Sequence, residues 1–292
     1  MGVKYALVFS GQGNTCSQNY KELFHKYREE VSIANEILGY SIEEFADSKN
    51  GIHFSNTKFM QPMLYVLNAL AFKELKATGD YFFVGHSLGE FNALQAAGAI
   101  SFEDGLKLVQ VRGDVMSKVP DGCMCAVCGE AFEKIINAIN DCNKNIEFDI
   151  ANYNSPKQIV ISGISGKIAE AKENLESQGL RCIPLHVSGA FHSQYMKQPN
   201  SEFVKVLNTI LFHELKGRVV SSATGKEYTN TNIKEILTVQ MYSPVKWIES
   251  INYIINEGVY SFYQVGDQRH LIKLIDEIKF SRAVAANRGN RQ

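Results

Sequence analysis

A serine between two glycines is the strongest candidate for chemistry in this 292-residue sequence. Residues 85–89 read Gly-His-Ser-Leu-Gly, after the apolar run 81–84 and before a helix-like stretch from 90 to 97. This context is typical of a nucleophile elbow, in which a sharp strand-to-helix turn exposes the hydroxyl of Ser87. The amide of Leu88 would then point to where an oxyanion forms. The alternative is a turn whose serine only caps the helix, and the pentapeptide alone leaves both open.

A serine nucleophile needs a base, because its hydroxyl reacts poorly at neutral pH. Among the seven histidines, His192 stands out because it follows a predicted strand, in the segment Ser188 to Ser193 that is rich in small residues. His86 is adjacent to Ser87 and would have to fold back past the turn, so we disfavour it as the base. The other interpretation of His192 is a polar residue that begins the next helix.

Arg112 is the second unusual residue, because its neighbours one helical turn away are all apolar. They are Leu108, Val109, Val115 and Met116. An arginine on an apolar helix face calls for an anionic partner. The sequence leaves open an internal salt bridge, a side chain that reaches to solvent, and a bidentate clamp for a substrate carboxylate.

A glycine-rich turn, Gly11-Gln12-Gly13, follows the first predicted strand. Glycines there could bring a backbone amide against a ligand. The spacing matches neither the dinucleotide-binding nor the P-loop pattern, which argues against a nucleotide phosphate site.

Composition argues against several other classes of function. A hydrophobic content of 45% and a charged content of 21% are typical of a globular protein, and a net charge of −1 gives no basic field for nucleic acid. No apolar run approaches the ~20 residues of a membrane span, and the N-terminus lacks the features of a signal peptide. The six cysteines, including Cys125 and Cys128, fit small apolar strand residues better than a metal or redox site. We therefore expect a reduced, cytoplasmic protein without a metal.

The elements that must position these residues follow an α/β pattern in the first half of the chain. We expect a strand at 3–9, the strand before Ser87, and helices at 19–38, 61–77 and 101–118. Ser101 and Asp104 resemble a capping box for the last of these helices.

After residue 122 the predicted order becomes β-α-β-β-α-β, which is the ferredoxin-like unit. The sequence therefore predicts an α/β fold with a large domain, 1–122 and 189–292, and an inserted small subdomain, 123–188. A helix at 202–211, strands at 219–221 and 261–265 with a helix between them, and a mobile basic tail at 279–292 complete the prediction.

Together these motifs resemble the acyltransferase family typified by bacterial malonyl-CoA:acyl carrier protein transacylase. The similarity runs in order from about residue 8 to about residue 275. The motifs that carry it are Phe9-Ser10-Gly11-Gln12-Gly13, Gln61-Pro62, Gly85-His86-Ser87-Leu88-Gly89-Glu90, Val111-Arg112-Gly113, Asn152-Tyr153-Asn154-Ser155-Pro156, Gly189-Ala190-Phe191-His192-Ser193, Gln240 with Pro244-Val245 and Trp247, and Val265-Gly266. The segments around Ser87 and His192 look most like free-standing acyltransferases that serve polyketide synthases lacking their own.

The resemblance implies an α/β-hydrolase-like large domain that carries a Ser–His dyad. Ser87 would attack a malonyl thioester, and His192 would take its proton while a backbone carbonyl of Gln240 orients the ring. The amides of Gln12 and Leu88 would hold the oxyanion. The small subdomain would form one wall of the cleft.

The resemblance also implies the substrates. Arg112 would hold the malonyl carboxylate, Gln61 would line the same pocket, and Phe191 would favour malonyl over branched extenders. Coenzyme A would leave malonyl-CoA first, and the phosphopantetheine thiol of an acyl carrier protein would then take the malonyl group, for polyketide or fatty acid synthesis. No cofactor or metal is implied, and free-standing members often act as monomers.

Two other functions stay open. One is an acyl hydrolase that clears acyl groups from carrier proteins with water as the acceptor, and the other is a non-catalytic carrier-binding protein. Arg112 discriminates between transfer and hydrolysis, because a carboxylate clamp serves no neutral acyl chain.

Some segments depart from the family pattern or extend beyond it. Gly266-Asp267-Gln268 replaces the common Gly-Pro-Gly, and Ser243 replaces a frequent asparagine. Carrier proteins are acidic and should dock on a basic face, so Lys279, Arg282 and Arg288 are candidates, with a solvated tail as the alternative.

Overall fold

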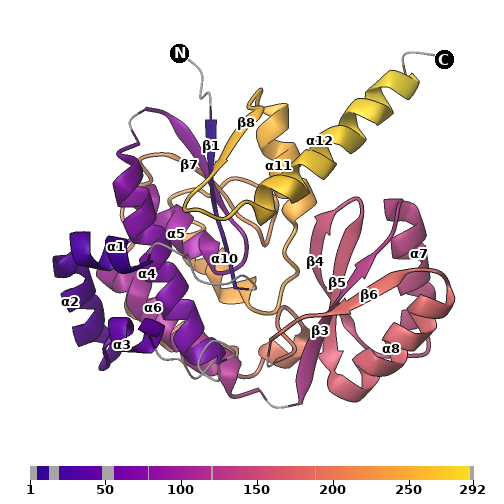
Figure 1. Ribbon diagram of the computed structural model, residues 1–292, viewed down its shortest axis with the longest axis horizontal. Helices are drawn as coiled ribbons and strands as arrows, with labels where there is room; N and C mark the ends of the chain where they lie inside the picture. Colours follow the sequence, from indigo (N-terminus) through magenta and orange to yellow (C-terminus); the bar gives the residue numbers. More distant parts are fainter. Residues whose placement is uncertain are drawn as a thin grey trace.

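The computed structural model describes residues 5–12, 20–47, 56–77, 79–119, 121–187 and 189–289. Gly13, Cys16 and Ser188, together with the side chain of Arg288, lie outside the described residues. Within these ranges the chain forms a larger body and a smaller one, which lie side by side in Figure 1.

The larger body is built on a parallel sheet of four strands in the order β7-β2-β1-β8. Its strands are β1 (Tyr5–Phe9), β2 (Tyr81–Gly85), β7 (Arg218–Val220) and β8 (Ser261–Gln264). Phe9 is in register with Gly85 at the carboxyl ends of β1 and β2. The turns that follow these two strands therefore meet at one edge of the sheet.

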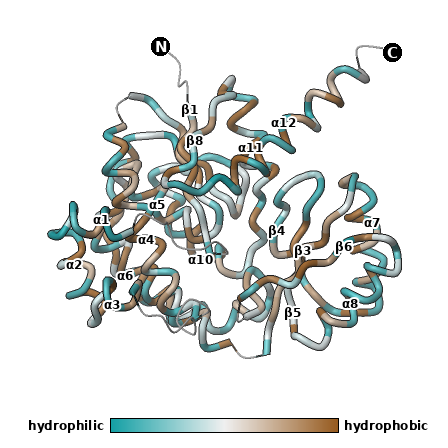
Figure 2. The backbone as a smooth tube through the Cα atoms, viewed as in Figure 1, coloured by the Kyte–Doolittle hydropathy of each residue, from teal (hydrophilic) through white to brown (hydrophobic). Residues whose placement is uncertain are grey.

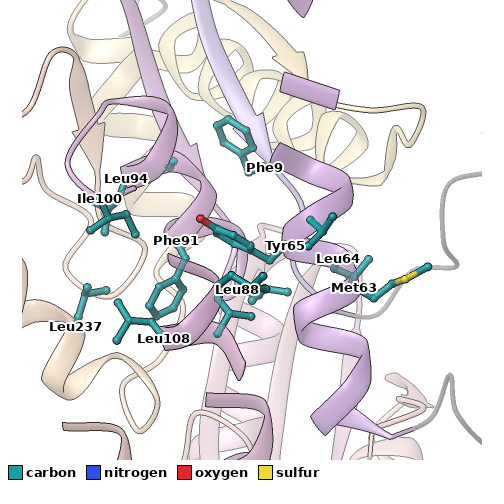
Figure 3. Packing of buried hydrophobic residues seen from close by; sticks show 14 of the residues in the cluster. Phe9, Met63, Leu64, Tyr65, Leu88, Phe91, Leu94, Ile100, Leu108 and Leu237 are labelled. Atoms are coloured by element: carbon teal, nitrogen blue, oxygen red, sulfur yellow. The ribbon is translucent and has the colours of Figure 1, made fainter. Parts of the chain in front are cut away.

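Apolar side chains cover both faces of this sheet, as expected for parallel strands. In β1, Leu7 and Phe9 join one core cluster while Ala6 and Val8 join the other. Figure 3 shows Phe9, Tyr65 and Phe91 packed within the first cluster.

Helices enclose these two clusters. The first cluster draws on α1 (Tyr20–Lys26), α2 (Arg28–Leu38), α3 (Ile42–Asp47), α4 (Thr57–Leu75), α5 (Gly89–Ala96), α6 (Phe102–Ser117), α9 (Asn200–Thr209) and α10 (Ile233–Gln240). The second draws on α11 (Trp247–Asn256) and α12 (His270–Gly289). No described helix is long and apolar enough to span a bilayer.

The smaller body has the element order β-α-β-β-α-β that the sequence predicts. Its elements are β3 (Gly122–Cys128), α7 (Phe132–Asn143), β4 (Asp149–Ser155), β5 (Gln158–Ile164), α8 (Ser165–Ser177) and β6 (Arg181–Pro184). The strands form an antiparallel sheet in the order β4-β5-β3-β6. Cys125 and Cys182 are buried in its core, and Figure 2 shows hydrophobic stretches along these strands.

A short backbone connection joins the two bodies. Tyr153 N donates to Val245 O at 2.9 Å, and Val245 N donates to Ala151 O at 2.8 Å. Val245 thereby continues the pairing of β4 into the larger body. A short 3-10 helix at Gln194–Met196 follows the segment that carries His192.

Two predictions about the helices need correction. The stretch 19–38 contains two helices, separated at Tyr27, instead of one. The prediction of a mobile tail at 279–292 is wrong for the part up to Gly289, because α12 extends to that residue. Arg282 fixes the later part of α12 to α11, since its guanidinium donates to Asn252 Oδ1 and Asn256 Oδ1.

Candidate active site

Ser87 lies at the tip of the turn between β2 and α5. Its φ of +52° is in the left-handed region, which residues with a side chain seldom adopt. A Cβ at Gly85 would lie 2.0 Å from the carbonyl carbon of Gly89, and one at Gly89 would lie 2.2 Å from Phe9 O. The glycines are therefore required by close backbone approach, and the predicted elbow is confirmed as a structure.

His192 lies beside this serine. Ser87 Oγ and His192 Nε2 are 2.7 Å apart, and the φ of His192 is +56°. His192 Nδ1 is 3.2 Å from Gln240 O and 3.0 Å from Ser243 O. Because carbonyl oxygens only accept, Nδ1 carries the proton and Nε2 presents its lone pair to the serine hydroxyl.

The surroundings keep this imidazole neutral. Burial, followed by the positive charge of Arg112, lowers the pKa of His192 to about 3, although the hydrogen bonds to the carbonyls act in the opposite direction. A neutral imidazole that accepts from a serine hydroxyl has the protonation state of a general base.

His86 points elsewhere. Its Nε2 lies 2.8 Å from Asn154 Oδ1, and its ring contacts the ring of Trp247. This orientation agrees with the expectation that His86 is not the partner of Ser87.

Arg112 is brought directly to the serine. Its side chain comes from α6, is 1% exposed, and donates from Nη2 to Ser87 Oγ at 3.0 Å. Nη1 donates to Gln61 Oε1 at 2.7 Å, and Nε and Nη2 donate to Gln240 Oε1 at 3.3 and 3.1 Å. Among the described residues, no carboxylate lies within ion-pair distance of the guanidinium. The internal salt bridge and the solvent-reaching side chain considered for Arg112 therefore do not describe its surroundings.

Gln12 and Leu88 occupy the two turns that meet at the sheet edge. Gln12 follows β1, and its Nε2 donates to Thr57 Oγ1 at 3.0 Å. Leu88 is the N-cap residue just before α5, and within the described part of the chain its amide donates to no backbone carbonyl. An amide at the first turn of a helix suits an oxyanion.

A cavity of about 680 Å³ opens over these residues. The larger body contributes Ser87, His192, Arg112, Gln61 and Gln12. The smaller body contributes Met124, Asn152, Ile183 and Pro184, so it forms one wall of the cleft as the sequence analysis expected. Much of the lining is apolar, including Met60, Met116, Leu185, Val187 and Phe191.

The two departures from the family pattern lie in different places. Ser243 contributes its backbone carbonyl to His192, so the replacement of asparagine leaves this acceptor in place. Gly266-Asp267-Gln268 lines a separate cavity of about 460 Å³, together with Ser10 and Asn68.

Lys279, one of the candidate docking residues, lies away from the serine. Lys279 Nζ donates to the carbonyl of Tyr260, the residue before β8. Since β8 and β2 both run parallel to β1, Lys279 is at the amino edge of the sheet and Ser87 is at the carboxyl edge.

Sequence reasoning missed Glu90 and the carbonyl of Ser243. Glu90 is fully buried and accepts hydrogen bonds from Ser222, Tyr228 and Gln240. In the sequence it resembles an ordinary acidic residue in the first turn of a helix. A backbone acceptor such as that of Ser243 leaves no signal in the residue type.

An elbow serine on a parallel sheet, bonded to a neutral histidine, defines the class of serine–histidine enzymes that handle acyl groups. Residues 8–266 match the acyl transferase domain, and the chain belongs to this family.

Curated relatives include two proteins of Bacillus subtilis. The polyketide biosynthesis malonyl CoA-acyl carrier protein transacylase PksC is 40% identical over 279 residues, covering 93% of this chain and 96% of PksC. The polyketide biosynthesis protein PksE is 39% identical over 277 residues, but the chain spans only 36% of its length.

Solved structures include the malonyl CoA-acyl carrier protein transacylase of Burkholderia pseudomallei. It is 34% identical, with a TM-score of 0.87, and the match covers 95% of this chain and 98% of that protein.

Proposed function

We propose that this protein transfers a malonyl group from malonyl-CoA to the phosphopantetheine thiol of an acyl carrier protein. The names of PksC and of the Burkholderia enzyme support this activity. The observation that carries it is the position of Arg112, whose buried guanidinium contacts Ser87 Oγ inside the cavity. A fixed cation beside the nucleophile suits an acyl group that ends in a carboxylate.

In the first half-reaction, His192 Nε2 takes the proton of Ser87 as Oγ attacks the thioester carbonyl. The amides of Gln12 and Leu88 hold the oxyanion of the tetrahedral intermediate. The carbon–sulfur bond then breaks, His192 returns the proton to the sulfur, and coenzyme A leaves a malonyl ester on Ser87.

In the second half-reaction, the carrier thiol gives its proton to His192 and its sulfur attacks the ester. The bond to Ser87 Oγ breaks, and His192 returns the proton to the serine. The carbonyls of Gln240 and Ser243 hold the ring in one tautomer through both steps. This chemistry uses a coenzyme A thioester as substrate and calls for no cofactor.

The cavity supports the specificity of this reaction. Arg112 and Gln61 form one polar side, where the malonyl carboxylate would bind. Phe191 lies on the wall beside His192 and is held close by Gly189, where a Cβ would lie 2.5 Å from its ring. A ring at this position would crowd a branch on the α-carbon.

The proposal also covers the domain organisation, the cellular location, the oligomeric state and the pathway. The strand order β4-β5-β3-β6 supports a ferredoxin-like subdomain at 123–188, inserted into an α/β-hydrolase-like domain of 1–122 and 189–292. We place the protein in the cytoplasm as a monomer that serves polyketide synthesis, the process named for PksC.

A transfer assay tests the function. The enzyme would be offered malonyl-, methylmalonyl- and acetyl-CoA with a phosphopantetheinylated carrier protein, and carrier loading would be scored against free acid. We expect malonyl loading to exceed hydrolysis and the other acyl groups. Release of most malonyl groups as free malonate would favour the hydrolase, and no acylation of folded enzyme would favour the carrier-binding protein.

A further inference from the structure

Glu90 is a buried carboxylate three residues after Ser87, in the first turn of α5. Its Oε1 accepts from Ser222 N at 3.1 Å and from Tyr228 OH at 2.7 Å. Its Oε2 accepts from Ser222 Oγ at 2.7 Å and from Gln240 Nε2 at 3.0 Å. Both oxygens of Glu90 therefore act as acceptors, each for two donors.

Gln240 connects this carboxylate to the active site. Its Nε2 also donates to Ser87 O at 2.8 Å, while its Oε1 accepts from Arg112. Because Oε2 of Glu90 accepts at this contact, the carboxylate requires Nε2 of Gln240 to face it. The same orientation turns Oε1 toward Arg112.

Glu90 also balances the positive charge of Arg112 without accepting a hydrogen bond from its guanidinium. Burial lowers the pKa of Arg112 to about 10 although the nearby charge of Glu90 acts in the opposite direction, and at this pKa the guanidinium stays protonated at neutral pH. Because Gln240 lies between the two charges, the nitrogens of Arg112 donate to neutral oxygens in every hydrogen bond that they form with described residues. A carboxylate bonded directly to Arg112 would compete with a substrate carboxylate for the same donors.

We propose that Glu90 is a positioning residue for selection of the malonyl carboxylate, because it orients the Gln240 amide that holds Arg112 directed toward the substrate and available to it. This inference rests on the proposed function and extends it to a residue that touches no reacting atom.

The isosteric variant Glu90→Gln makes the inference testable. The new amide oxygen would take the place of Oε1, where two donors point, and its NH₂ group would face Nε2 of Gln240. Two donors cannot pair, and a turned Gln240 amide would set its NH₂ group against the donors of Arg112 and its oxygen against Ser87 O, so the amide would be displaced from Arg112. Arg112 would lose an acceptor, while the carbonyls that orient His192 would remain.

The experiment compares two reactions of Ser87 by intact-mass analysis: malonylation by malonyl-CoA and sulfonylation by a small neutral sulfonyl fluoride. For Glu90→Gln we expect the ratio of the two rate constants to fall about tenfold or more, equivalent to about 1.4 kcal/mol. Most of the change should be a higher KM for malonyl-CoA, with sulfonylation within about threefold of the wild-type rate.

Tyr228→Phe is the matched control, because it removes one donor to Glu90 but keeps the carboxylate and its bond to Gln240. Its rate ratio should stay within about twofold of wild type.

A wild-type ratio in Glu90→Gln, or an equal fall in Tyr228→Phe, would overturn the inference. If wild-type Ser87 is sulfonylated but never malonylated, the proposed function fails instead. Should Glu90→Gln not fold, Gln240→Met tests the same relay, and an unchanged ratio there would also overturn it.

Discussion

Ser87 and His192 share an uncommon backbone conformation, with φ of +52° and +56°. Each left-handed residue with a side chain costs on the order of 1–3 kcal/mol, which the surrounding structure must offset. The His192 amide donates to Met241 O at 3.1 Å, and the His86 amide donates to Phe9 O at 3.0 Å. These bonds fix the backbone on both sides of the hydrogen bond between Oγ and Nε2, so the dyad is held in place before substrate binds.

At Arg112, we predict that substitution by alanine changes the choice of acyl group. Arg112→Ala should lower kcat/KM for malonyl-CoA about a hundredfold, because two charge-assisted hydrogen bonds at about 1.5 kcal/mol each are lost. Relative tolerance for acetyl-CoA should rise. Steady-state kinetics with both thioesters checks this, and unchanged malonyl loading would refute the clamp.

At His192, we predict an unusual pH dependence. Since burial and Arg112 lower its pKa from the usual 6.5 to about 3, the ring is already neutral and competent as a base throughout the neutral and mildly acidic range. In the free enzyme, kcat/KM for malonyl-CoA should therefore stay flat from about pH 8 to about pH 5. An acid limb centred near the ordinary histidine pKa would show that the imidazole is not buried as described.

At the scale of elements, the sequence predicted those features that depend on the type of a local residue, such as a glycine in a tight turn. Gly85 and Gly89 indicated the elbow. The apolar neighbours of Arg112 marked it as unusual, but its burial is a finding of the structure. The break at Tyr27 was missed. The extension of α12 to Gly289 was missed too, because the bonds from Arg282 to Asn252 and Asn256 of α11 join segments that are distant in the sequence. Glu90 was missed because its partners come from distant segments of the chain.

The elbow gives a prediction about stability. Gly89→Ala should destabilise the fold by about 3 kcal/mol or more, because its methyl group would meet Phe9 O at 2.2 Å. Gly166→Ala in α8 is the control, since nothing lies within 4 Å of its Cβ, and it should be neutral or stabilise by up to about 1 kcal/mol. Urea unfolding measures both, and equal effects would contradict the close approach.

At the scale of the whole molecule, one short segment links the active site to the smaller body. Ser243 holds His192 through its carbonyl, and Val245, two residues later, pairs with β4. Lys246 N donates to Ser222 O, and Ser222 in turn contacts Glu90. The cleft wall, the histidine and the buried carboxylate are therefore connected through residues 243–246.

The position of α12 gives a prediction about the carrier protein. Lys279 and Arg282 are bonded to Tyr260, Asn252 and Asn256, and Lys279 lies at the amino edge of the sheet, opposite Ser87. We therefore expect Lys279→Glu to change the KM for carrier protein less than about twofold, even at low salt. A rise of about tenfold in carrier KM, with the KM for malonyl-CoA unchanged, would restore α12 as a docking surface.

The central claim is that Ser87 holds a malonyl ester that passes to a thiol. Wild-type enzyme would be mixed with one equivalent of malonyl-CoA, followed by intact-mass analysis before and after addition of phosphopantetheinylated carrier protein, with Ser87→Ala as the control. We predict a malonyl adduct on Ser87 that disappears as an equal amount of malonyl carrier protein forms, and no adduct in the control. An adduct that forms equally in Ser87→Ala, or one that decays to free malonate without loading the carrier, would contradict the account.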